Sequence, residues 1–458
     1  MDIMLALVQN LSRTRFEDLT PESVAAAKKG IVDTIGVMLA GSSTRGCKLL
    51  VEAIKDWGGK KESSIAVFGE KVPPNLAALA NGSMARALDI DDVSDTVALH
   101  ADALIVPTAL SIADTKNGIN GQDLITSVAL GQDLMVRMAL AVKLSSLASG
   151  RFNLFKIFAA TGTAGRLMGL NEEQLANAMG IAYSHLVGDA QALHDNAMTS
   201  YIQEGVAAKS AIESVIFAEK GITGTKNMLQ GPKGFFNAIE PDPDLDALTF
   251  ELGKRFQGIE IAIKPYASSR TTHQAIDLAL DIVKNEGIHL SLIDRITIRV
   301  SDETYNLTCH PLDRKRHPKT RNEAQFSMPF TVATALMTGD FFISELRDDV
   351  IKDPDILGLA ERVTPIKDNE CRTDKSIGVT VMEIETRDGQ KFLKKKLFPK
   401  GNPNDPMDMD ECLEKFEKCV KYAHRPFSNE QVGRITRILS ELENLEEASH
   451  LVRLLVPY

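Results

Sequence analysis

Aromatic residues and cysteine are both scarce in this chain. Tryptophan, tyrosine and phenylalanine make up 5% of its 458 residues, whereas alanine and leucine are plentiful, and this composition favours helix over sheet. The five cysteines are widely scattered, and no CxxC pair occurs among them. The spacing argues against a zinc or iron–sulfur site, so no metal is expected, and it gives no indication of disulfide bonds.

Positive charge is also in short supply. The chain carries 52 lysines and arginines against 62 aspartates and glutamates, a formal net charge of −10. A nucleic-acid-binding protein would show a basic face, so no nucleic-acid partner is expected. An acidic protein that binds an anion must instead gather a few cations locally, and such clusters are the features to look for.

The amino-terminal sequence lacks the features of a secretory signal. Asp2 stands where such a signal carries positive charge, and the apolar run after it is short and is interrupted by Gln9 and Asn10. No window is expected to span a membrane, because none shows the required length of apolar sequence. The expectation is a cytoplasmic protein without a membrane partner.

The pattern of the chain changes once along its length, which is about three times that of a typical domain. Residues up to about 260 read as successive helices, including the uncharged stretch Ala103–Ala113, which should lie in the core. Later, Arg295–Val300 alternates strictly and Arg387–Gln390 has the composition of a hairpin turn. We predict a mainly α protein. We expect an all-helical domain made of residues 1–264 and 401–458, into which a smaller α+β domain, residues 265–400, is inserted.

The most unusual segment is an acidic stretch followed by a histidine. Asp89, Asp91, Asp92 and Asp95 precede His100. If Asp89 and Asp92 end a helix, their spacing of three residues places them on one face. Carboxylates at the negative end of a helix are unfavourable unless they bind a cationic group. The alternative is a solvated acidic loop. An EF-hand is not indicated, because its glycine and final glutamate are missing.

A second unusual segment gathers cations against the overall charge. Lys264, Ser268, Ser269, Arg270 and His273 lie within ten residues, where a loop should lead into a helix. Backbone N–H groups and the positive dipole at a helix start suit a carboxylate or phosphate group. The alternative is an ordinary helix cap with surface cations, in which His273 packs or caps within the first helical turn.

Six blocks occur in an order that is familiar from one enzyme family. They are NGSMARALDIDD, the downstream His100, GRLMGLNEEQLANAMGIA, IKPYASSRTTHQAID, NEAQFSMPFTVATAL and PKGNPNDPM. Together they resemble the MmgE/PrpD family of 2-methylcitrate dehydratase, cis-aconitate decarboxylase and iminodisuccinate epimerase, over essentially the whole chain. The resemblance implies a helical domain with an inserted α+β domain, usually as a homodimer. It also implies a small polycarboxylate substrate and catalysis without metal or organic cofactor.

The resemblance further implies which residues form the site. Asp89 matches the first aspartate of the family's D-x-D-D stretch, and His100 matches its downstream histidine. Lys264 matches the lysine at the junction with the second domain, with Arg270 and His273 in the adjoining positions. We therefore expect His100, Asp89 and Lys264 to be catalytic, and Arg270 and His273 to bind substrate.

Several family positions are changed in this chain. Val93 replaces the threonine after D-x-D-D, and the G-[WF]-H-P-T segment reads GRFNL, without its histidine. Ser200 and Gln203 replace the lysine and histidine of a T-K-x-x-H pattern, and Phe330 replaces a tyrosine. Ser200 stays a candidate substrate contact, and Arg151 is a candidate replacement for the lost cation. These changes predict a substrate or reaction that differs from those of the named family members.

Dehydration and epimerisation both start with removal of a proton alpha to a carboxylate in the expected mechanism. This step needs a base, and cations that stabilise the charge moving onto the carboxylate oxygens. We expect His100 to act as base or acid, oriented by Asp89, since a neighbouring carboxylate fixes the imidazole tautomer. Lys264 and Arg270 would hold substrate carboxylates, with Arg270 as the bidentate partner.

Three hypotheses follow from these residues. The first is a lyase, foremost a hydro-lyase acting on a hydroxy di- or tricarboxylate, with a decarboxylase as a related alternative. The second is an epimerase or isomerase of a substituted succinate. The third is a catalytically silent homologue that binds a carboxylate. The changed family positions favour the third, whereas the retained Asp89, His100 and Lys264 favour an enzyme.

Overall fold

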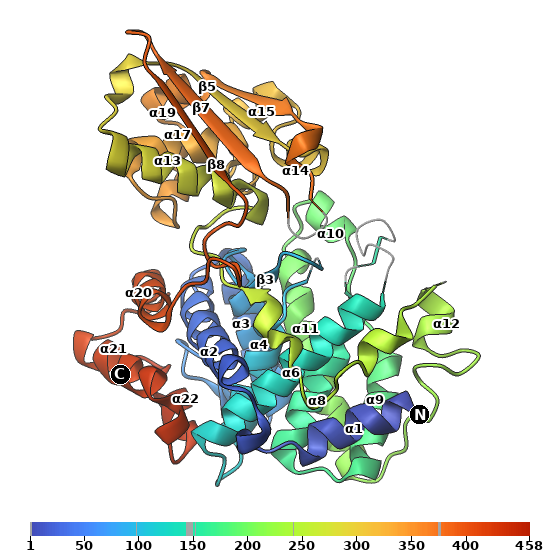
Figure 1. Ribbon diagram of the computed structural model, residues 1–458. Coiled ribbons are helices and arrows are strands. Elements are labelled where there is room, and N and C mark those ends of the chain that lie inside the picture. The colour runs from blue at the N-terminus through green and yellow to red at the C-terminus, as the bar shows by residue number, and fades with distance from the viewer. Residues whose placement is uncertain (1, 98, 143–149, 152, 241, 374–376) are drawn as a thin grey trace. The chain divides into compact units, whose positions relative to one another are not determined.

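The computed structural model describes residues 2–97, 99–142, 150–151, 153–240, 242–373 and 377–458. The described chain is mainly helical with only small sheets, which confirms the predicted mainly α class. It divides into two compact units, the first formed by Met1–Ile261 and Asp408–Tyr458 and the second by Ala262–Met407 (Figure 1). Phe152, in the altered GRFNL segment, lies outside the described residues.

The first unit is a helical unit built around a buried central helix. Every residue of α5 (Asp102–Ala113) is buried, as predicted for the uncharged stretch, and other helices pack around it. The helices that contact it most extensively are α4 (Pro74–Arg86), α6 (Gly121–Ala141), α8 (Lys156–Met168) and α11 (Thr199–Glu219). The remaining α-helices described in this unit are α1 (Ile3–Arg13), α2 (Pro21–Gly41), α3 (Arg45–Trp57), α9 (Glu172–Ala182), α10 (Gln191–His194), α12 (Phe235–Ile239), α20 (Met409–Val420), α21 (Asn429–Ser440) and α22 (Ala448–Leu454).

Two glycines let α4 and α11 cross in direct backbone contact. A Cβ atom at Gly205 would lie 2.0 Å from the carbonyl oxygen of Leu79 and 2.3 Å from Ser83 Oγ. A Cβ atom at Gly82 would lie 3.1 Å from the Cα atom of Gly205. Glycine is therefore required here for the close approach of two backbones. The crossing fixes the C-terminal end of α4, which carries Arg86, against α11.

α6 corrects the expectation that no segment has the composition of a membrane span. Among the described residues it is the helix that is long and apolar enough to cross a membrane, with a mean hydropathy of 1.3. However, 94% of this window is buried inside the protein. The core position of the helix therefore accounts for its apolar composition.

The second unit packs helices on a small, mostly antiparallel sheet. The strand order is β6 (Val363–Lys367), β5 (Ile293–Val300), β7 (Thr380–Thr386) and β8 (Lys391–Lys396). β5 runs parallel to β6 and antiparallel to β7, and β7 and β8 form the hairpin predicted at Arg387–Gln390. α13 (His273–Glu286) and α17 (Met328–Thr338) contact the sheet (Figure 1). The shorter helices described here are α14 (Asp302–Thr308), α15 (Leu312–Arg316), α16 (Arg321–Gln325), α18 (Asp348–Ile351) and α19 (Pro354–Ala360).

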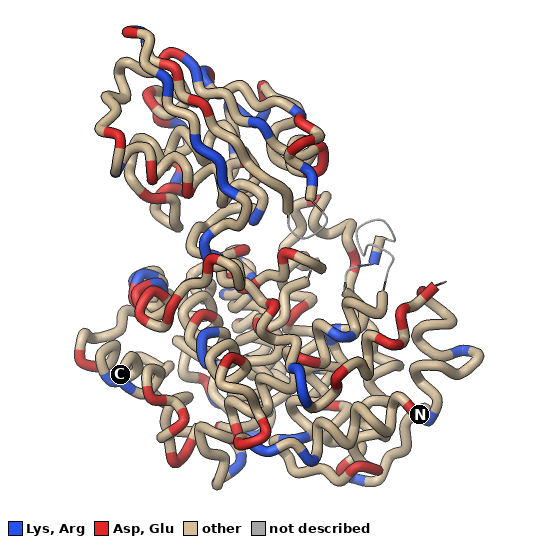
Figure 2. The backbone as a smooth tube through the Cα atoms, in the orientation of Figure 1, with Lys and Arg blue, Asp and Glu red and all other residues tan. Residues whose placement is uncertain are grey.

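Basic residues are prominent on the strands of this sheet, above all on β8 (Figure 2). Each of Lys391, Lys394 and Lys396 nevertheless forms an ion pair with an acidic neighbour. The partners are Glu385 on β7 for the first, and Asp281 and Asp277 on α13 for the other two. These three lysines of β8 are thus neutralised within the unit.

Candidate functional site

The acidic segment leaves the helical conformation before its first aspartate. α4 ends at Arg86, and Asp89 has a φ of 57°, in the left-handed region, so a right-handed helix cannot continue through it. The expectation that Asp89 and Asp92 end a helix on one face is therefore wrong. The turn instead brings Asp89 and Asp91 within hydrogen-bond distance of the Arg86 guanidinium.

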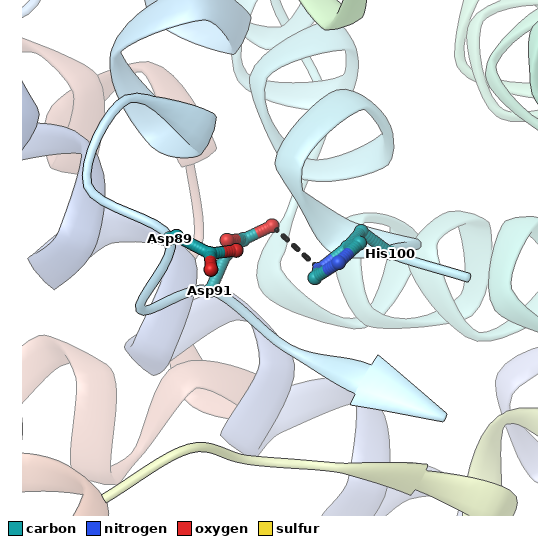
Figure 3. A group of neighbouring side chains, drawn as sticks. All are labelled: Asp89, Asp91 and His100. Atoms are coloured by element: carbon teal, nitrogen blue, oxygen red, sulfur yellow. Dashed lines mark ion pairs between the residues drawn. The ribbon is translucent and has the colours of Figure 1, made fainter. Parts of the chain in front are cut away.

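Arg86, Asp89, Asp91 and His100 form one group of side chains, here called the Arg86 cluster. Figure 3 shows its two aspartates and the histidine converging. Arg86 Nη1 donates to Asp89 Oδ1 at 2.5 Å and to Asp91 Oδ1 at 3.0 Å. Arg86 Nη2 lies 3.3 Å from His100 Nε2. Asp91 is fully buried, whereas 12% of the His100 side chain is exposed. The imidazole therefore lies where the core meets solvent.

Hydrogen-bond chemistry fixes the protonation of the His100 ring. A guanidinium can only donate, so Nε2 accepts from Arg86. Nδ1 lies 2.6 Å from the backbone oxygen of Asp92 and 3.1 Å from Asp91 Oδ2, and both oxygens are acceptors, so Nδ1 carries the proton. His100 is thus a neutral imidazole whose Nε2 lone pair faces a cation.

The structure pairs the His100 ring with Asp91, whereas we expected Asp89 beside it. Asp91 Oδ2 lies 3.1 Å from His100 Nδ1, while Asp89 bonds to Arg86. The physical reason is the left-handed turn at Asp89, after which the chain brings the second carboxylate to the imidazole. Orientation of His100 by an aspartate of this stretch stays a proposal, and Asp91 is the aspartate in contact with the ring.

Two further buried carboxyl groups, those of Asp92 and Asp102, lie near His100 in sequence. Asp92 accepts hydrogen bonds from the backbone N–H groups of Ala101 at 2.8 Å and Asp102 at 3.0 Å. Burial raises the pKa of Asp92 well above its usual range, and neighbouring carboxylates raise it further. Burial also raises the pKa of Asp102 to about 7, although Gln132 Nε2 donates to both of its oxygens at 2.9 Å. Asp102 therefore retains a proton at pH values where exposed carboxyl groups have lost theirs.

Replacing Asp102 by asparagine should change the dependence of stability on pH. Between about pH 4 and 7 the Asp102 carboxyl group holds a proton in the folded protein that it has released in the unfolded chain, so its contribution to the free energy of unfolding falls as the pH rises. Asparagine makes no such contribution, so the slope of the free energy of unfolding against pH should be more negative in the wild type than in the variant, by an amount on the order of 1 kcal/mol per pH unit. Denaturant titrations of both proteins across this range measure it. Equal slopes would contradict the buried-proton interpretation.

The Arg86 cluster also has the dimensions of a small cation site. One ligand atom from each of Asp89, Asp91 and His100 lies within 4.8 Å of the other two. However, the Arg86 guanidinium already bonds to both carboxylates and also faces His100 Nε2, the ring nitrogen that holds the lone pair. The donor set therefore fits a guanidinium better than a metal ion.

A buried ion pair that the sequence did not reveal acts electrostatically on Arg86. Lys156 Nζ on α8 lies 2.9 Å from Glu204 Oε1 on α11, and each of the two side chains is 1% exposed. Burial lowers the pKa of Arg86, but the carboxylates of Asp91, Asp89 and Glu204 outweigh burial and raise it above its ordinary value. The guanidinium therefore stays charged.

The predicted cations of the second unit are buried. Lys264 and Arg270 are 2% and 6% exposed, and His273 at the start of α13 is fully buried. Arg270 Nη1 donates to the Lys400 carbonyl oxygen at 2.9 Å and lies 3.3 Å from His273 Nδ1. His273 Nε2 lies 3.2 Å from the Ser268 carbonyl oxygen. These bonds engage both ring nitrogens of His273, so the structure favours its packing role over a substrate contact.

Three of the changed family positions have structural roles in this fold. Gln203 holds the loop before α10, because its amide donates to the carbonyl oxygen of Asp189 and accepts from the N–H group of the same residue. Phe330 on α17 is fully buried and packs edge-on against Phe341. Val93 is buried in the short strand β3 (Val93–Ser94).

Within the described part of the chain, Arg86 bonds to Asp89, Asp91 and His100, and neither Ser200 nor Arg151 is among these partners. Ser200 lies in the first turn of α11, where its carbonyl oxygen accepts from Gln203 Nε2 at 3.1 Å. Arg151 is exposed on the loop before α8. Both residues were named as candidate substrate contacts from family positions alone. No local sequence pattern indicates whether they lie near the Arg86 cluster.

Known proteins match this chain over most of its length. The MmgE/PrpD N-terminal domain matches residues 6–248, and the MmgE/PrpD C-terminal domain matches residues 266–442. A cis-aconitate decarboxylase-like protein of Aspergillus oryzae is 22% identical, covering 96% of this chain and 94% of that protein. The cis-aconitate decarboxylase of Homo sapiens is 23% identical, with 95% and 90% covered. The 2-methylcitrate dehydratase of Escherichia coli is 21% identical, with 91% and 89% covered.

Proposed function

This chain belongs to the MmgE/PrpD family, and on that premise we propose that it is a lyase acting on a small di- or tricarboxylic acid. The reaction that we propose is dehydration of a hydroxy acid, begun by removal of a proton alpha to a carboxylate. The Arg86 cluster supports this proposal, because it combines a neutral imidazole, a charged guanidinium and a buried carboxylate.

The observation that carries the proposal is the Nε2 lone pair of His100 facing Arg86 Nη2. A carboxylate is a stronger partner for a guanidinium than an imidazole nitrogen is. Binding of a substrate carboxylate to Arg86 would therefore release Nε2, which can then accept the alpha proton. Asp91 would stabilise the resulting imidazolium through Nδ1. The imidazolium can return the proton to the departing hydroxyl group, so that water leaves and a carbon–carbon double bond forms.

We also propose roles for the cations of the second unit in the same reaction. Lys264 acts as a catalytic cation that stabilises charge on a substrate carboxylate, and Arg270 binds a carboxylate. His273 positions Arg270, to judge from its contact with the guanidinium. Ser200 and Arg151 stay proposed substrate contacts.

Decarboxylation is the second candidate function, because the Aspergillus oryzae and human relatives are named for that activity. Decarboxylation needs a proton for the carbanion that remains after CO2 leaves. His100 would take that proton from solvent at Nε2 once Arg86 binds the substrate, and the imidazolium would pass it to the carbanion. Epimerisation of a substituted succinate would need a second proton donor on the opposite face of the substrate. A silent carboxylate-binding homologue would need neither. Identities of 21–23% do not rank these alternatives.

A panel of polycarboxylates tests the proposed function. Citrate, 2-methylcitrate, cis-aconitate, malate and substituted succinates would be incubated with the protein, with and without EDTA, and the products analysed by mass spectrometry. We expect loss of water from a hydroxy acid, unaffected by EDTA, and a rise in melting temperature that follows RT ln(1 + [L]/Kd). Loss of CO2 would favour the decarboxylase. Melting-point shifts without any product would favour the silent homologue, and neutral sugars serve as the control ligands.

Other properties implied by the family also stay proposals. We propose a cytoplasmic homodimer that uses no metal or organic cofactor and has no nucleic-acid or membrane partner. Light scattering on the purified protein measures the oligomeric state.

A further inference from the structure

We propose that Lys415 is a positioning residue that holds the acidic loop of the Arg86 cluster in its reactive conformation. Lys415 lies on α20, close to the C-terminus, and its side chain is 4% exposed. Its Nζ atom lies 2.5 Å from Asp33 Oδ1 on α2 and donates to the Ile90 carbonyl oxygen at 2.7 Å. The inference rests on the proposed function of the Arg86 cluster, and it assigns to that cluster a residue from a distant part of the chain.

The contact with Ile90 lies at the centre of the acidic loop of the Arg86 cluster. Ile90 is the residue between Asp89 and Asp91, so its carbonyl oxygen is the backbone anchor between the two carboxylates that bond to Arg86. The loop begins with a left-handed residue, φ 57° at Asp89, a conformation that persists only when surrounding contacts hold it. Lys415 supplies such a contact.

Charge is the second reason for a lysine at this position. Asp33, Asp91, Asp92 and Asp102 are all buried, with exposures of 0% or 1%. Lys415 neutralises Asp33, whose negative charge contributes to the raised pKa of Asp102. Lys415 thus combines two roles, neutralising a buried carboxylate and anchoring a loop backbone, and substitutions can separate them.

The test compares two variants that differ only at residue 415. Asp33→Asn removes the carboxylate but leaves Nζ bonded to the Ile90 carbonyl oxygen, whether the amine is charged or neutral. Asp33→Asn with Lys415→Met removes that bond as well, without leaving an unpaired buried charge. We expect the single variant to keep kcat within about threefold of the wild type. The double variant should lose about 10-fold to 100-fold in kcat, as expected when reacting groups are displaced by about 1 Å.

NMR of the His100 ring, recorded without substrate, makes the test independent of turnover. Selective 15N labelling of histidine reports on both ring nitrogens of His100, whose signals are assigned with His100→Gln. These signals should move in the double variant and stay in place in Asp33→Asn. If the wild type turned over no substrate, the proposed function would fail while these spectra still tested the anchoring by Lys415.

A matched control uses another buried ion pair of the same unit. Arg137 Nε bonds to Asp133, and its other nitrogens donate to the carbonyl oxygens of residues 247, 250 and 255. Asp133→Asn with Arg137→Met should lower the melting temperature yet leave kcat and the His100 signals unchanged below that temperature. Identical kcat and His100 signals in Asp33→Asn with and without Lys415→Met would overturn the inference. If the methionine variant does not fold, Lys415→Gln in the Asp33→Asn background replaces it, with the same two expected results.

Discussion

Replacing His100 by alanine should lower kcat by about 10²–10⁴, the usual contribution of a positioned general base. Folding should change little, because the side chain is partly exposed and contributes polar contacts more than core volume. Asp91→Asn should also reduce kcat, since an amide cannot stabilise an imidazolium through Nδ1. Steady-state kinetics on the substrate found in the polycarboxylate panel measure both effects.

Lys264→Ala should mainly raise KM, because Lys264 is proposed to hold a substrate carboxylate.

The control for His100 is a histidine of the same unit that lies away from the acidic loop in sequence. His450 is exposed on α22, and His450→Ala should keep the kcat of the wild type. If His100→Ala retained kcat within a few-fold of the wild type, His100 would not be the reacting base, and Arg86 would bind an anion without proton transfer to the imidazole.

Replacing Gly205 by alanine should destabilise the first unit by about 3 kcal/mol or more, at or beyond the upper end for overpacked cores. The added Cβ would meet the Leu79 carbonyl oxygen at 2.0 Å, and a helix backbone cannot yield as a flexible side chain can. Any protein that does fold should also lose activity, because a displaced α4 moves Arg86. Denaturant unfolding and the yield of soluble protein measure the effect.

Gly433 provides the matched control for this substitution. It lies within α21, and a Cβ atom added there would meet no other atom within 4 Å. Gly433→Ala should therefore stabilise the protein by up to about 1 kcal/mol through helix propensity alone. Wild-type stability of Gly205→Ala would show that α4 and α11 are not held as close as described.

Local sequence patterns were sufficient to predict most of the secondary structure. The uncharged stretch Ala103–Ala113 and the alternation in Arg295–Val300 each report burial directly, because the period of apolar residues reflects which faces are covered. The hairpin turn at Arg387–Gln390 was predictable because its residues favour that backbone conformation. The end of α4 was not predictable in this way, because Asp89 adopts a left-handed conformation that its sequence context does not require.

The candidate site was predictable only where its members are close in sequence. Asp89 and His100 were named together, and Arg86 was overlooked although it stands three residues before Asp89. Lys156 and Glu204 are 48 residues apart, and Lys415 is 325 residues from Ile90. No local pattern links such residues, because tertiary packing, here the crossing of helices at glycines, decides which of them meet.

Hydrogen exchange in D2O tests the central claim, that His100 removes a proton alpha to a substrate carboxylate. The probe is tricarballylate, a tricarboxylate without a leaving hydroxyl group, so that proton removal is observed without elimination. The wild type should bind this compound and introduce deuterium next to its carboxylates, as seen by NMR, whereas His100→Ala should bind it without exchange. Lys264→Ala should retain exchange at saturating ligand. Exchange at the wild-type rate in His100→Ala, or no exchange in a wild type that binds the probe and turns over its substrate, would contradict the account.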